Sequence, residues 1–153
     1  MALIFRKARA GDLATIVGLL ADDDLGRQRE DASRDLTAYQ RAFEQIEADR
    51  NQFLCVAEED GQVVGTLQLS FIPGLSRGGA KRGMIEAVRV AGDQRSKGVG
   101  RAMFDWAIAT CRAEGCTLVQ LTTDKTRPDA HRFYDALGFE ASHVGYKLHL
   151  VQG

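Results

Sequence analysis

The first fifty residues show apolar residues in patterns that predict one strand and two helices. Leu3 to Ala8 is predicted to form a strand, and Asp12 offers a side-chain oxygen that caps a helix ending near Ala21. A second amphipathic helix follows further along the chain, since its apolar residues are again three and four positions apart. The residues that define the two stripes are Leu13, Ile16, Val17 and Leu20, and then Leu36, Tyr39, Phe43 and Ile46. The charged residues 22 to 31 between them favour a mobile connection over a binding motif.

The middle of the chain predicts an antiparallel hairpin. Residues 53–58 and 62–72 are rich in β-branched and aromatic side chains, and Asp60-Gly61 between them is a turn signal that supplies positive φ. Pro73-Gly74 ends the second strand, and a glycine-rich loop follows from Leu75 to Gly83. Its basic residues are Arg77, Lys81 and Arg82. They are either ordinary solvated charges or a wall of an acceptor pocket that admits an anionic group.

The remainder of the chain alternates strands with helices. The predicted elements are a buried strand at 84–90, an apolar helix from Val99 that Gly115 closes, a strand at 117–123, a short helix from Pro128 to Gly138, and strands at 139–142 and 145–151. Helices that alternate with strands late in the chain, after an early hairpin, imply a mixed sheet with helices on both faces. The predicted fold class is therefore α/β, of the mixed α+β kind.

Length and charge narrow the possible classes of protein. A chain of 153 residues fits one domain, residues 1–153, whose core needs no disulfide or structural metal. Lys plus Arg number 20 and Asp plus Glu number 21, so the net charge of −1 argues against general attraction to nucleic acid or to an anionic membrane. No segment approaches the ~20 apolar residues of a membrane span, and the N-terminus does not have the pattern of a signal peptide. A soluble, cytoplasmic protein is expected.

The cysteines and histidines do not indicate a metal site. The three cysteines form no C-x-x-C pair, which favours reduced thiols, and Cys55 and Cys111 fall on apolar faces that predict core positions. His131, His143 and His149 lack the spacing of metal ligands. We therefore interpret them as surface or strand-edge residues.

The loop between the strand at 84–90 and the following helix has the features of a phosphate site. Amides in the first turn of a helix have no partner inside the helix, and the helix dipole favours negative charge there. Gly98 and Gly100 would let these amides approach a diphosphate. The spacing excludes a Walker loop, which needs glycine where Lys97 stands, and a dinucleotide fingerprint, which needs Gly or Ala where Met103 stands. An ordinary strand-to-helix turn is the alternative.

Two motifs resemble those of the GNAT superfamily of N-acetyltransferases. The spacing Arg-x-x-Gly-x-Gly, at Arg95, Gly98 and Gly100, is similar to the acyl-CoA loop of that superfamily. Further along, the elements of a second superfamily motif fall at Ala130, Phe133, Tyr134, Gly138 and Phe139. The resemblance covers roughly residues 53 to 150, and the first fifty residues match only in general pattern. It implies a central, mostly antiparallel mixed sheet of six to seven strands, splayed around an acyl-CoA cleft.

The resemblance also implies that acetyl-CoA is the co-substrate, and it assigns residues to its binding. The diphosphate is expected at the loop residues Arg95, Ser96, Lys97, Gly98, Val99, Gly100 and Arg101. The pantetheine arm is expected along the strand at 84–90, bonded by the backbone of Val88 and Val90. Many relatives carry asparagine where this chain has Arg127, whose side chain only donates hydrogen bonds. Arg127 is expected to meet a phosphate or the acceptor, and its role stays open.

Acetyl transfer to an amine needs one group that accepts a proton and one that protonates the leaving sulfur. An alkyl amine has a pKa of about 10.4, so it arrives charged at neutral pH. Glu86 is the candidate base, because burial in an apolar strand would raise the pKa of its carboxyl toward the working range. Alternatively, it points to the solvent side of that strand. Tyr134 is the candidate acid on the strength of the resemblance, and its alternative is a core position with the hydroxyl at the rim.

The leading hypothesis is an acetyl-CoA-dependent N-acetyltransferase that acts on a primary amine of a small molecule by direct attack in a ternary complex. Protein or peptide amines are the nearest rival acceptors. A non-catalytic acyl-CoA sensor and a purely interacting domain are the hypotheses from other classes, and Glu86 and Tyr134 argue against the sensor. Residues 25–50 and 73–83 are expected to border the acceptor pocket, and their mixed charge selects no particular amine. The resemblance makes a homodimer plausible.

Overall fold

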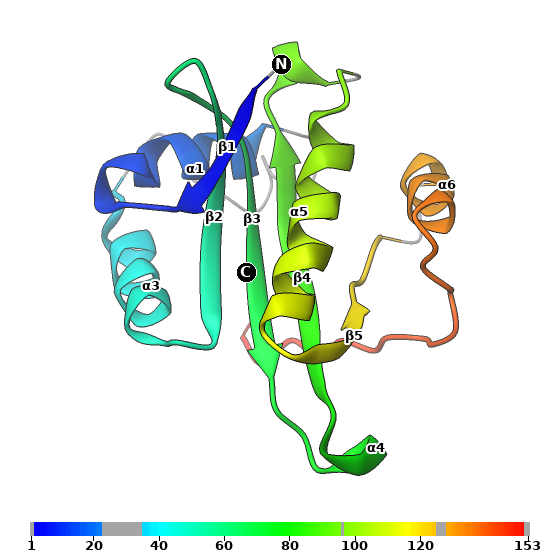
Figure 1. Ribbon diagram of the computed structural model, residues 1–153. Helices are drawn as coiled ribbons and strands as arrows, with labels where there is room; N and C mark the ends of the chain where they lie inside the picture. Colours follow the sequence, from blue (N-terminus) through cyan, green and yellow to red (C-terminus); the bar gives the residue numbers. More distant parts are fainter. Residues whose placement is uncertain (1, 23–34, 96, 125–127, 152–153) are drawn as a thin grey trace. The chain divides into compact units, whose positions relative to one another are not determined.

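The computed structural model describes residues 2–22, 35–95, 97–124 and 128–151 (Figure 1). The chain divides into two compact units, one up to Val119 and one from Gln120 onward. The connection predicted at residues 22–31 lies outside the described residues, apart from Asp22.

The sheet has five strands among the described residues, and their order in space is their order in the sequence. They are β1 (Leu3–Lys7), β2 (Gln52–Glu59), β3 (Gln62–Ile72), β4 (Lys81–Val90) and β5 (Cys116–Gln120). The pairs from β1 to β4 are antiparallel, whereas a helix connects β4 to β5, as parallel neighbours require. The predicted fold class is confirmed, with fewer strands than the six to seven that the resemblance implied.

The predicted hairpin is confirmed by the pairing of β2 with β3. Its register runs from Gln52 opposite Ser70 to Glu59 opposite Gln62. Asp60 and Gly61 both have positive φ, at 52° and 79°, which is the backbone that a two-residue hairpin turn of the primed type needs. The Asp60-Gly61 turn therefore sets the register in which β2 pairs with β3.

Helices cover both faces of the sheet, as predicted (Figure 1). On one face lie α1 (Leu13–Ala21) and α3 (Thr37–Ala48), whose buried side chains form a cluster against Leu54 of β2. The members of that cluster are Leu13, Val17 and Phe43. On the other face lies α5 (Val99–Ala113), whose Trp106 stacks on Phe5 with ring centroids 5.4 Å apart.

Gly65 lets α5 approach the sheet closely. A Cβ at this position of β3 would lie 2.7 Å from the sulfur of Met103, which is fully buried on α5. Any side chain here would push α5 away from the sheet or force Met103 to move. The position matters for the site, because α5 carries the candidate phosphate loop at its N-terminus.

The tip between β3 and β4 differs from the predicted open loop. Residues Ser76–Gly79 form a short helical turn, α4, and β4 begins at Lys81 rather than at Met84. Three successive residues with positive φ, at positions 77 to 79, curl the chain back on itself. As a result β4 pairs with β3 earlier than expected, with Ile72 opposite Arg82.

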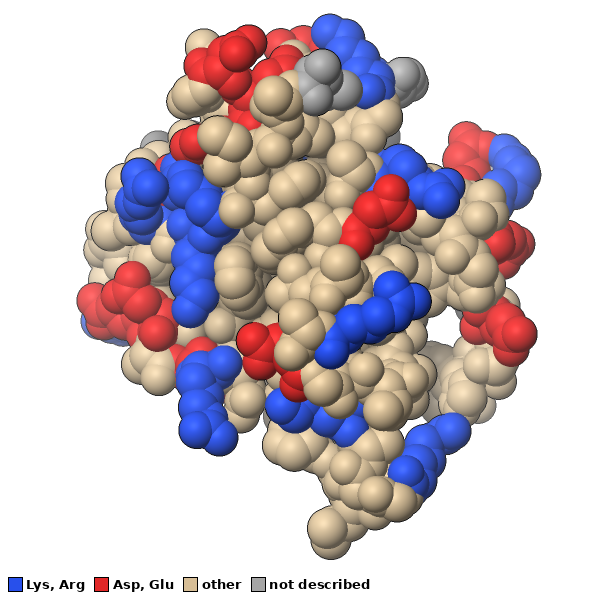
Figure 2. Space-filling view, viewed as in Figure 1, with Lys and Arg blue, Asp and Glu red and all other residues tan. Residues whose placement is uncertain are grey.

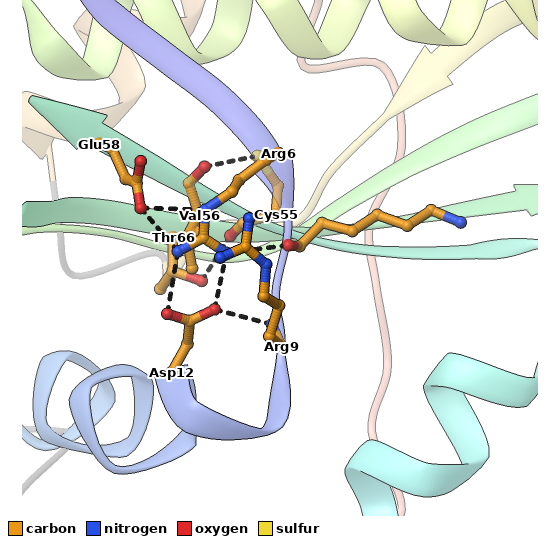
Figure 3. A network of polar contacts seen from close by, with 8 residues as sticks. Arg6, Arg9, Asp12, Cys55, Val56, Glu58 and Thr66 are labelled. Carbon is orange, nitrogen blue, oxygen red and sulfur yellow. Dashed lines mark hydrogen bonds and ion pairs between the residues drawn. The ribbon is translucent and has the colours of Figure 1, made fainter. Parts of the chain in front are cut away.

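The side chain of Arg6 ties β1 to β2 and to the start of α1 (Figure 3). Its guanidinium donates to both carboxylate oxygens of Asp12, at 2.8 and 3.0 Å, and twice to Glu58, at 2.7 and 3.0 Å. Asp12 also accepts the N–H of Arg9 at 2.7 Å, around the 3₁₀ turn η1 (Ala10–Asp12). The predicted side-chain cap is therefore wrong. Helix α1 begins directly after Asp12, but the Asp12 carboxylate bonds Arg6 and Arg9 and makes no capping hydrogen bond to the helix.

The second unit contains α6 (Pro128–Ala136), which begins at the predicted Pro128 and ends two residues before the predicted Gly138. Gly138, with φ of 97°, follows the helix, and the N–H of Phe139 donates back to the carbonyl of Tyr134 at 3.1 Å. The predicted strands at 139–142 and 145–151 are wrong, since no strand forms there, and β5 ends before the predicted Thr123. A strand needs a neighbour for its backbone groups, and no described residue pairs with this segment.

Candidate active site

A β-bulge interrupts β4 at the candidate site. Gln68 lies opposite Glu86 and Thr66 lies opposite Arg89, so a single residue of β3 faces the two residues Ala87 and Val88. Ala87 has φ of 54°, a left-handed conformation that a residue with a Cβ seldom adopts. Bulges bend a strand and redirect its side chains, and they recur beside active sites. No pattern in the sequence predicted this one.

Glu86 is the last residue of β4 before the bulge, and it is exposed. Its expected burial is therefore wrong, and the solvent-side alternative describes its position. The register places Glu86 on the same face as Gln68 and, across the bulge, as Arg89. Their partners on β3, Gln68 and Thr66, are two residues apart, which is ~6.6 Å along an extended strand, so Arg89 lies at about that distance from Glu86.

A polar strip crosses the sheet beside Glu86. The amide oxygen of Gln52 accepts a hydrogen bond from the side-chain N–H of Gln68 at 2.9 Å and another from the hydroxyl of Ser70 at 3.0 Å. Ser70 is buried, whereas both glutamines are half-buried. These polar groups lie on the face that α1 and α3 cover, next to the apolar cluster that includes Leu54. The sequence analysis missed them, because isolated polar residues in strands carry no motif.

The carbonyls at the end of β4 accept hydrogen bonds from arginines. The carbonyl of Val88 accepts from the guanidinium of Arg89 at 2.9 Å, and that of Val90 accepts from Nε of Arg95 at 3.3 Å. A pantetheine arm that used these carbonyls would replace contacts of two arginine side chains. The expected backbone binding at Val88 and Val90 stays a prediction.

The loop after β4 brings the expected glycines to the head of α5. After the 3₁₀ turn η2 (Gly92–Gln94), Gly98 adopts φ of 83° and immediately precedes the helix. The N–H of Ala102 donates to the carbonyl of Gly98 at 3.1 Å, so the amides of residues 99 to 101 precede the first hydrogen-bonded turn. This is the geometry of an anion site at a helix N-terminus.

The two loop glycines differ in what requires them. The positive φ of Gly98 favours glycine on conformational grounds alone. Gly100 has ordinary helical φ, and a Cβ there would meet only a methyl of Val90 at 3.9 Å. Packing within the chain therefore does not demand glycine at position 100, and the open space beside it is available to a ligand.

The basic side chains of the loop lie at the surface. Arg95 contacts Asp22 at 3.5 Å and Arg101 contacts Asp105 at 3.4 Å, and all four side chains are at least half exposed. Exposed pairs of this kind contribute little free energy, so either arginine can turn to an anion at low cost. Lys97 is exposed as well, while Ser96 lies outside the described residues.

Tyr134 lies on α6 in the second unit, whereas Glu86 and the loop lie in the first. It is half-buried, and its ring meets Phe133 and Phe139 edge-on, with centroids 5.7 and 6.2 Å apart. Arg127 lies outside the described residues.

The described residues of the first unit line at least two concavities. The larger, of about 410 Å³, lies between β1, the start of β2 and α3, and it reaches the polar strip at Gln52. The smaller, of about 140 Å³, lies at the β3–β4 tip beside Arg77 and Arg82. Arg77 has φ of 55°, a left-handed conformation that costs a residue with a Cβ about 1 kcal/mol. Whether either concavity holds an acceptor stays a prediction.

The face of the molecule in Figure 2 carries no broad patch of one charge. Figure 2 shows basic and acidic side chains interspersed over the face in view. Among the described residues no helix is both long and apolar enough to cross a bilayer, and no three His, Cys, Asp or Glu side chains in that part of the chain gather as a metal site would require.

Cys55 and Cys111 occupy the predicted core positions, and Cys116 is half-buried. Cys55 and Cys111 are fully buried, and burial raises the pKa of the Cys55 thiol to about 12 and that of the Cys111 thiol to about 11. Cys116 at the start of β5 lies beside Cys111, close enough for a hydrogen bond between the thiols. Raised pKa values leave few thiolates at neutral pH, so the pair is unsuited to nucleophilic catalysis.

Comparison with known proteins finds an acetyltransferase family and two N-acetyltransferases that are similar to this chain. Residues 19–139 match the model of the Acetyltransferase (GNAT) family. The aminoalkylphosphonate N-acetyltransferase of Salmonella typhimurium is 31% identical over 112 residues, which are 73% of this chain and 72% of that protein. The glucosamine 6-phosphate N-acetyltransferase of Trypanosoma brucei brucei is 35% identical over 91 residues, 59% of each chain.

A solved structure extends the similarity to nearly the whole chain. The crystal structure of a transcriptional regulator from Bacillus halodurans C-125 is 47% identical, with a TM-score of 0.93. The match covers 97% of this chain and 100% of that one.

Proposed function

Because the chain belongs to the GNAT family of acetyltransferases, we propose that it transfers the acetyl group of acetyl-CoA to a primary amine of a small molecule by direct attack in a ternary complex. The observation that carries the proposal is the strand–loop–helix unit, in which the bulged strand β4 leads to Gly98 and the open first turn of α5. Family membership supports acyl transfer in general, and the strand–loop–helix unit supports acetyl-CoA as the acyl donor.

The donor's diphosphate would accept hydrogen bonds from the amides of residues 99 to 101. Arg95, Lys97 and Arg101 would turn from their surface positions to add positive charge, and Gly100 would leave room for the close approach of the phosphates. The thioester would then lie along β4 near its bulge. Ser96 and Arg127 remain candidates for the same task.

The chemistry requires movement of protons at two positions. Glu86 accepts a proton from the incoming ammonium, through water, because an exposed carboxylate reaches its partner most easily that way. The neutral amine then forms a bond to the thioester carbon. When the carbon–sulfur bond breaks, the phenol of Tyr134 gives its proton to the departing sulfur. The amine nitrogen then loses its second proton, which passes through water to the Tyr134 phenolate and restores the phenol. Amide and coenzyme A thiol are the products.

The acceptor we propose is a compact amine that carries a phosphonate or phosphate group. The two N-acetyltransferases that the chain resembles are named for acceptors of that kind, an aminoalkylphosphonate and glucosamine 6-phosphate. Arg89 lies on the same face as Glu86, ~6.6 Å along the strand, which suits an anion and an amine separated by a few bonds. Arg82 is four residues from Glu86, or ~13 Å, and is too far for the same compact molecule.

A direct test measures binding and turnover separately. Titration with acetyl-CoA should release heat, and thiol release should follow when 2-aminoethylphosphonate or glucosamine 6-phosphate is added. Heat without turnover on a broad panel of amines would support the second candidate, a non-catalytic acyl-CoA sensor. That candidate is kept because the 47% identical Bacillus halodurans protein is described as a transcriptional regulator. Absence of heat would contradict both.

Two variants test the assigned roles. Tyr134→Phe should lower kcat by ~10²-fold or more and leave the Kd for acetyl-CoA nearly unchanged, because the phenol acts on the leaving sulfur. Tyr146→Phe, which alters an exposed tyrosine, is the matched control. Arg89→Gln should raise KM for 2-aminoethylphosphonate while sparing ethanolamine, and Arg82→Gln should change neither. Equal losses for both acceptors in Arg89→Gln would remove Arg89 from anion binding.

A further inference from the structure

The polar strip of Gln52, Gln68 and Ser70 lies directly beside Glu86 on the sheet. Gln68 is opposite Glu86 in the pairing of β3 with β4, so the two side chains share one face, with Cβ atoms ~5 Å apart. Ser70 follows on the same face of β3 and is 7% exposed. Polar groups on the covered side of a sheet cost desolvation that apolar residues would avoid. We therefore expect the strip to serve a ligand rather than the core.

The bonds within the strip orient the amide of Gln68. The side-chain oxygen of Gln52 accepts from the N–H of Gln68 at 2.9 Å and from the hydroxyl of Ser70 at 3.0 Å, which uses both of its lone pairs. The N–H group of Gln68 is thus turned toward β2. An amide carries its oxygen and its nitrogen on opposite sides, so the oxygen of Gln68 is left for the β4 side. No group in the described part of the chain donates a hydrogen bond to it.

Two hydrogen-bond acceptors therefore face the same space. The carboxylate of Glu86 is exposed, and the amide oxygen of Gln68 lies across from it on the neighbouring strand. An ionised carboxylate and an amide oxygen only accept hydrogen bonds. A primary ammonium has three N–H donors and a positive charge, so it satisfies both groups, whereas an anion would satisfy neither. The pair suits the amine end of an acceptor.

We propose that Gln68 binds the amine of the acceptor, and that Gln52 is a positioning residue that holds the Gln68 amide in the binding orientation. This assignment rests on the proposed function. One N–H of the ammonium donates to the oxygen of Gln68, while Glu86 takes another proton through water. The neutral amine keeps its bond to Gln68, which restricts the rotation of the amine and of its lone pair. The phosphonate of the same molecule lies toward Arg89, ~6.6 Å along the strand.

A matched pair of methionine variants tests the role of Gln68. Gln68→Met keeps the length of the side chain but removes the amide oxygen. KM for 2-aminoethylphosphonate should therefore rise by ~10-fold or more, the loss expected for a hydrogen bond to a charged group. KM for ethanolamine should rise by a similar factor, because both acceptors carry the amine. Gln62→Met, at the exposed start of β3, is the control and should change neither value. The Kd for acetyl-CoA should stay the same in both variants.

An inhibitor that lacks the amine separates amine binding from general damage to the site. The inhibition constant of ethylphosphonate should be the same for Gln68→Met and for the wild type, since this compound has no N–H to donate to Gln68. An inhibition constant that rises as much as KM would mean that Gln68 only supports the shape of the site, and it would overturn the assignment. An unchanged KM for 2-aminoethylphosphonate would overturn it as well.

Rescue by a conservative variant tests the positioning by Gln52. Gln52→Met removes the oxygen that holds the Gln68 amide, so KM should rise for both amines. Gln52→Glu keeps an oxygen that accepts from Gln68 and Ser70, so KM should return close to the wild-type value. Equal KM values in the two variants would show that Gln52 does not orient Gln68. If the wild type releases no thiol with any amine, the proposed function fails and the assignment of Gln68 with it. If the wild type turns over and Gln68→Met keeps a normal KM, the assignment of Gln68 alone is refuted.

Discussion

The β2–β3 hairpin and the C-terminal segment have the same kind of sequence but different structures. Both alternate apolar and polar residues over the length of a strand. In the hairpin the alternation yields ladders, and Leu67 and Leu69 are fully buried. In the segment at 143–151 the equivalent apolar side chains are exposed and no strand forms.

The difference shows that alternation selects a face but does not provide a neighbour. Asp60-Gly61 gives the hairpin a partner strand two residues away, so its pairing is local and independent of the rest of the chain. The C-terminal segment has no turn of this type next to it. Its pairing depends on an edge that is distant in sequence, or on another molecule.

The largest expected contrast comes from removing one leucine in each region. Leu67→Ala should lower the free energy of unfolding by ~2–5 kcal/mol, because Leu67 is fully buried and its loss leaves a cavity. Leu148→Ala should change it by less than about 0.5 kcal/mol in dilute monomer, since that side chain is exposed. Urea denaturation measures both. A large loss for Leu148→Ala that is independent of protein concentration would mean that the segment packs within its own chain.

A smaller effect is expected at β1, an edge strand that is held by ion pairs. The hydrogen bonds from Arg6 hold the pKa of Asp12 below its ordinary value of 3.8. A lowered pKa in the folded state adds stability above pH 3.8, and that stability is lost as the pH falls below it. Asp12→Asn should therefore cost ~1 kcal/mol at pH 7 and progressively less toward pH 3. Denaturation at a series of pH values checks this, and a cost that stays constant with pH would contradict the ionic explanation.

The smallest expected change in stability comes from replacing one glycine in each region. Gly61 has φ of 79° in the hairpin turn, so Gly61→Ala should cost ~1 kcal/mol through backbone strain. Gly145 has no positive φ and no atom within 4 Å of an added Cβ. Gly145→Ala should leave stability unchanged or raise it by a few tenths of a kcal/mol, because it restricts the unfolded chain. Thermal unfolding of both variants gives the comparison, and similar losses would show that the segment is constrained.

Prediction from sequence succeeded in the candidate site where one residue type has one physical reason. Gly98 was assigned to the loop before a helix because it would let the first-turn amides approach a diphosphate, and it directly precedes α5 with φ of 83°. Glu86 was misplaced, since it lies on the side of β4 opposite the buried Ile85 and is exposed. The bulge at Ala87 was missed because it depends on how β3 and β4 pair over several residues. The bonds of Gln52 with Gln68 and Ser70 were invisible for the same reason, because the three residues meet only when β2 and β3 align.

By itself the sequence determined the helices α1, α3, α5 and α6, the hairpin and the glycine loop, because apolar spacing, turn residues and positive φ act between neighbours in the chain. The tertiary structure decided the bulge that sets Glu86 and Arg89 on one face, the clamp of Arg6 on Asp12, and the close approach of Met103 to Gly65. Among the described residues, the alternating segment at 143–151 forms no strand. These features depend on the neighbour that a residue meets in space, and the spacing of residues along a single chain does not specify that neighbour.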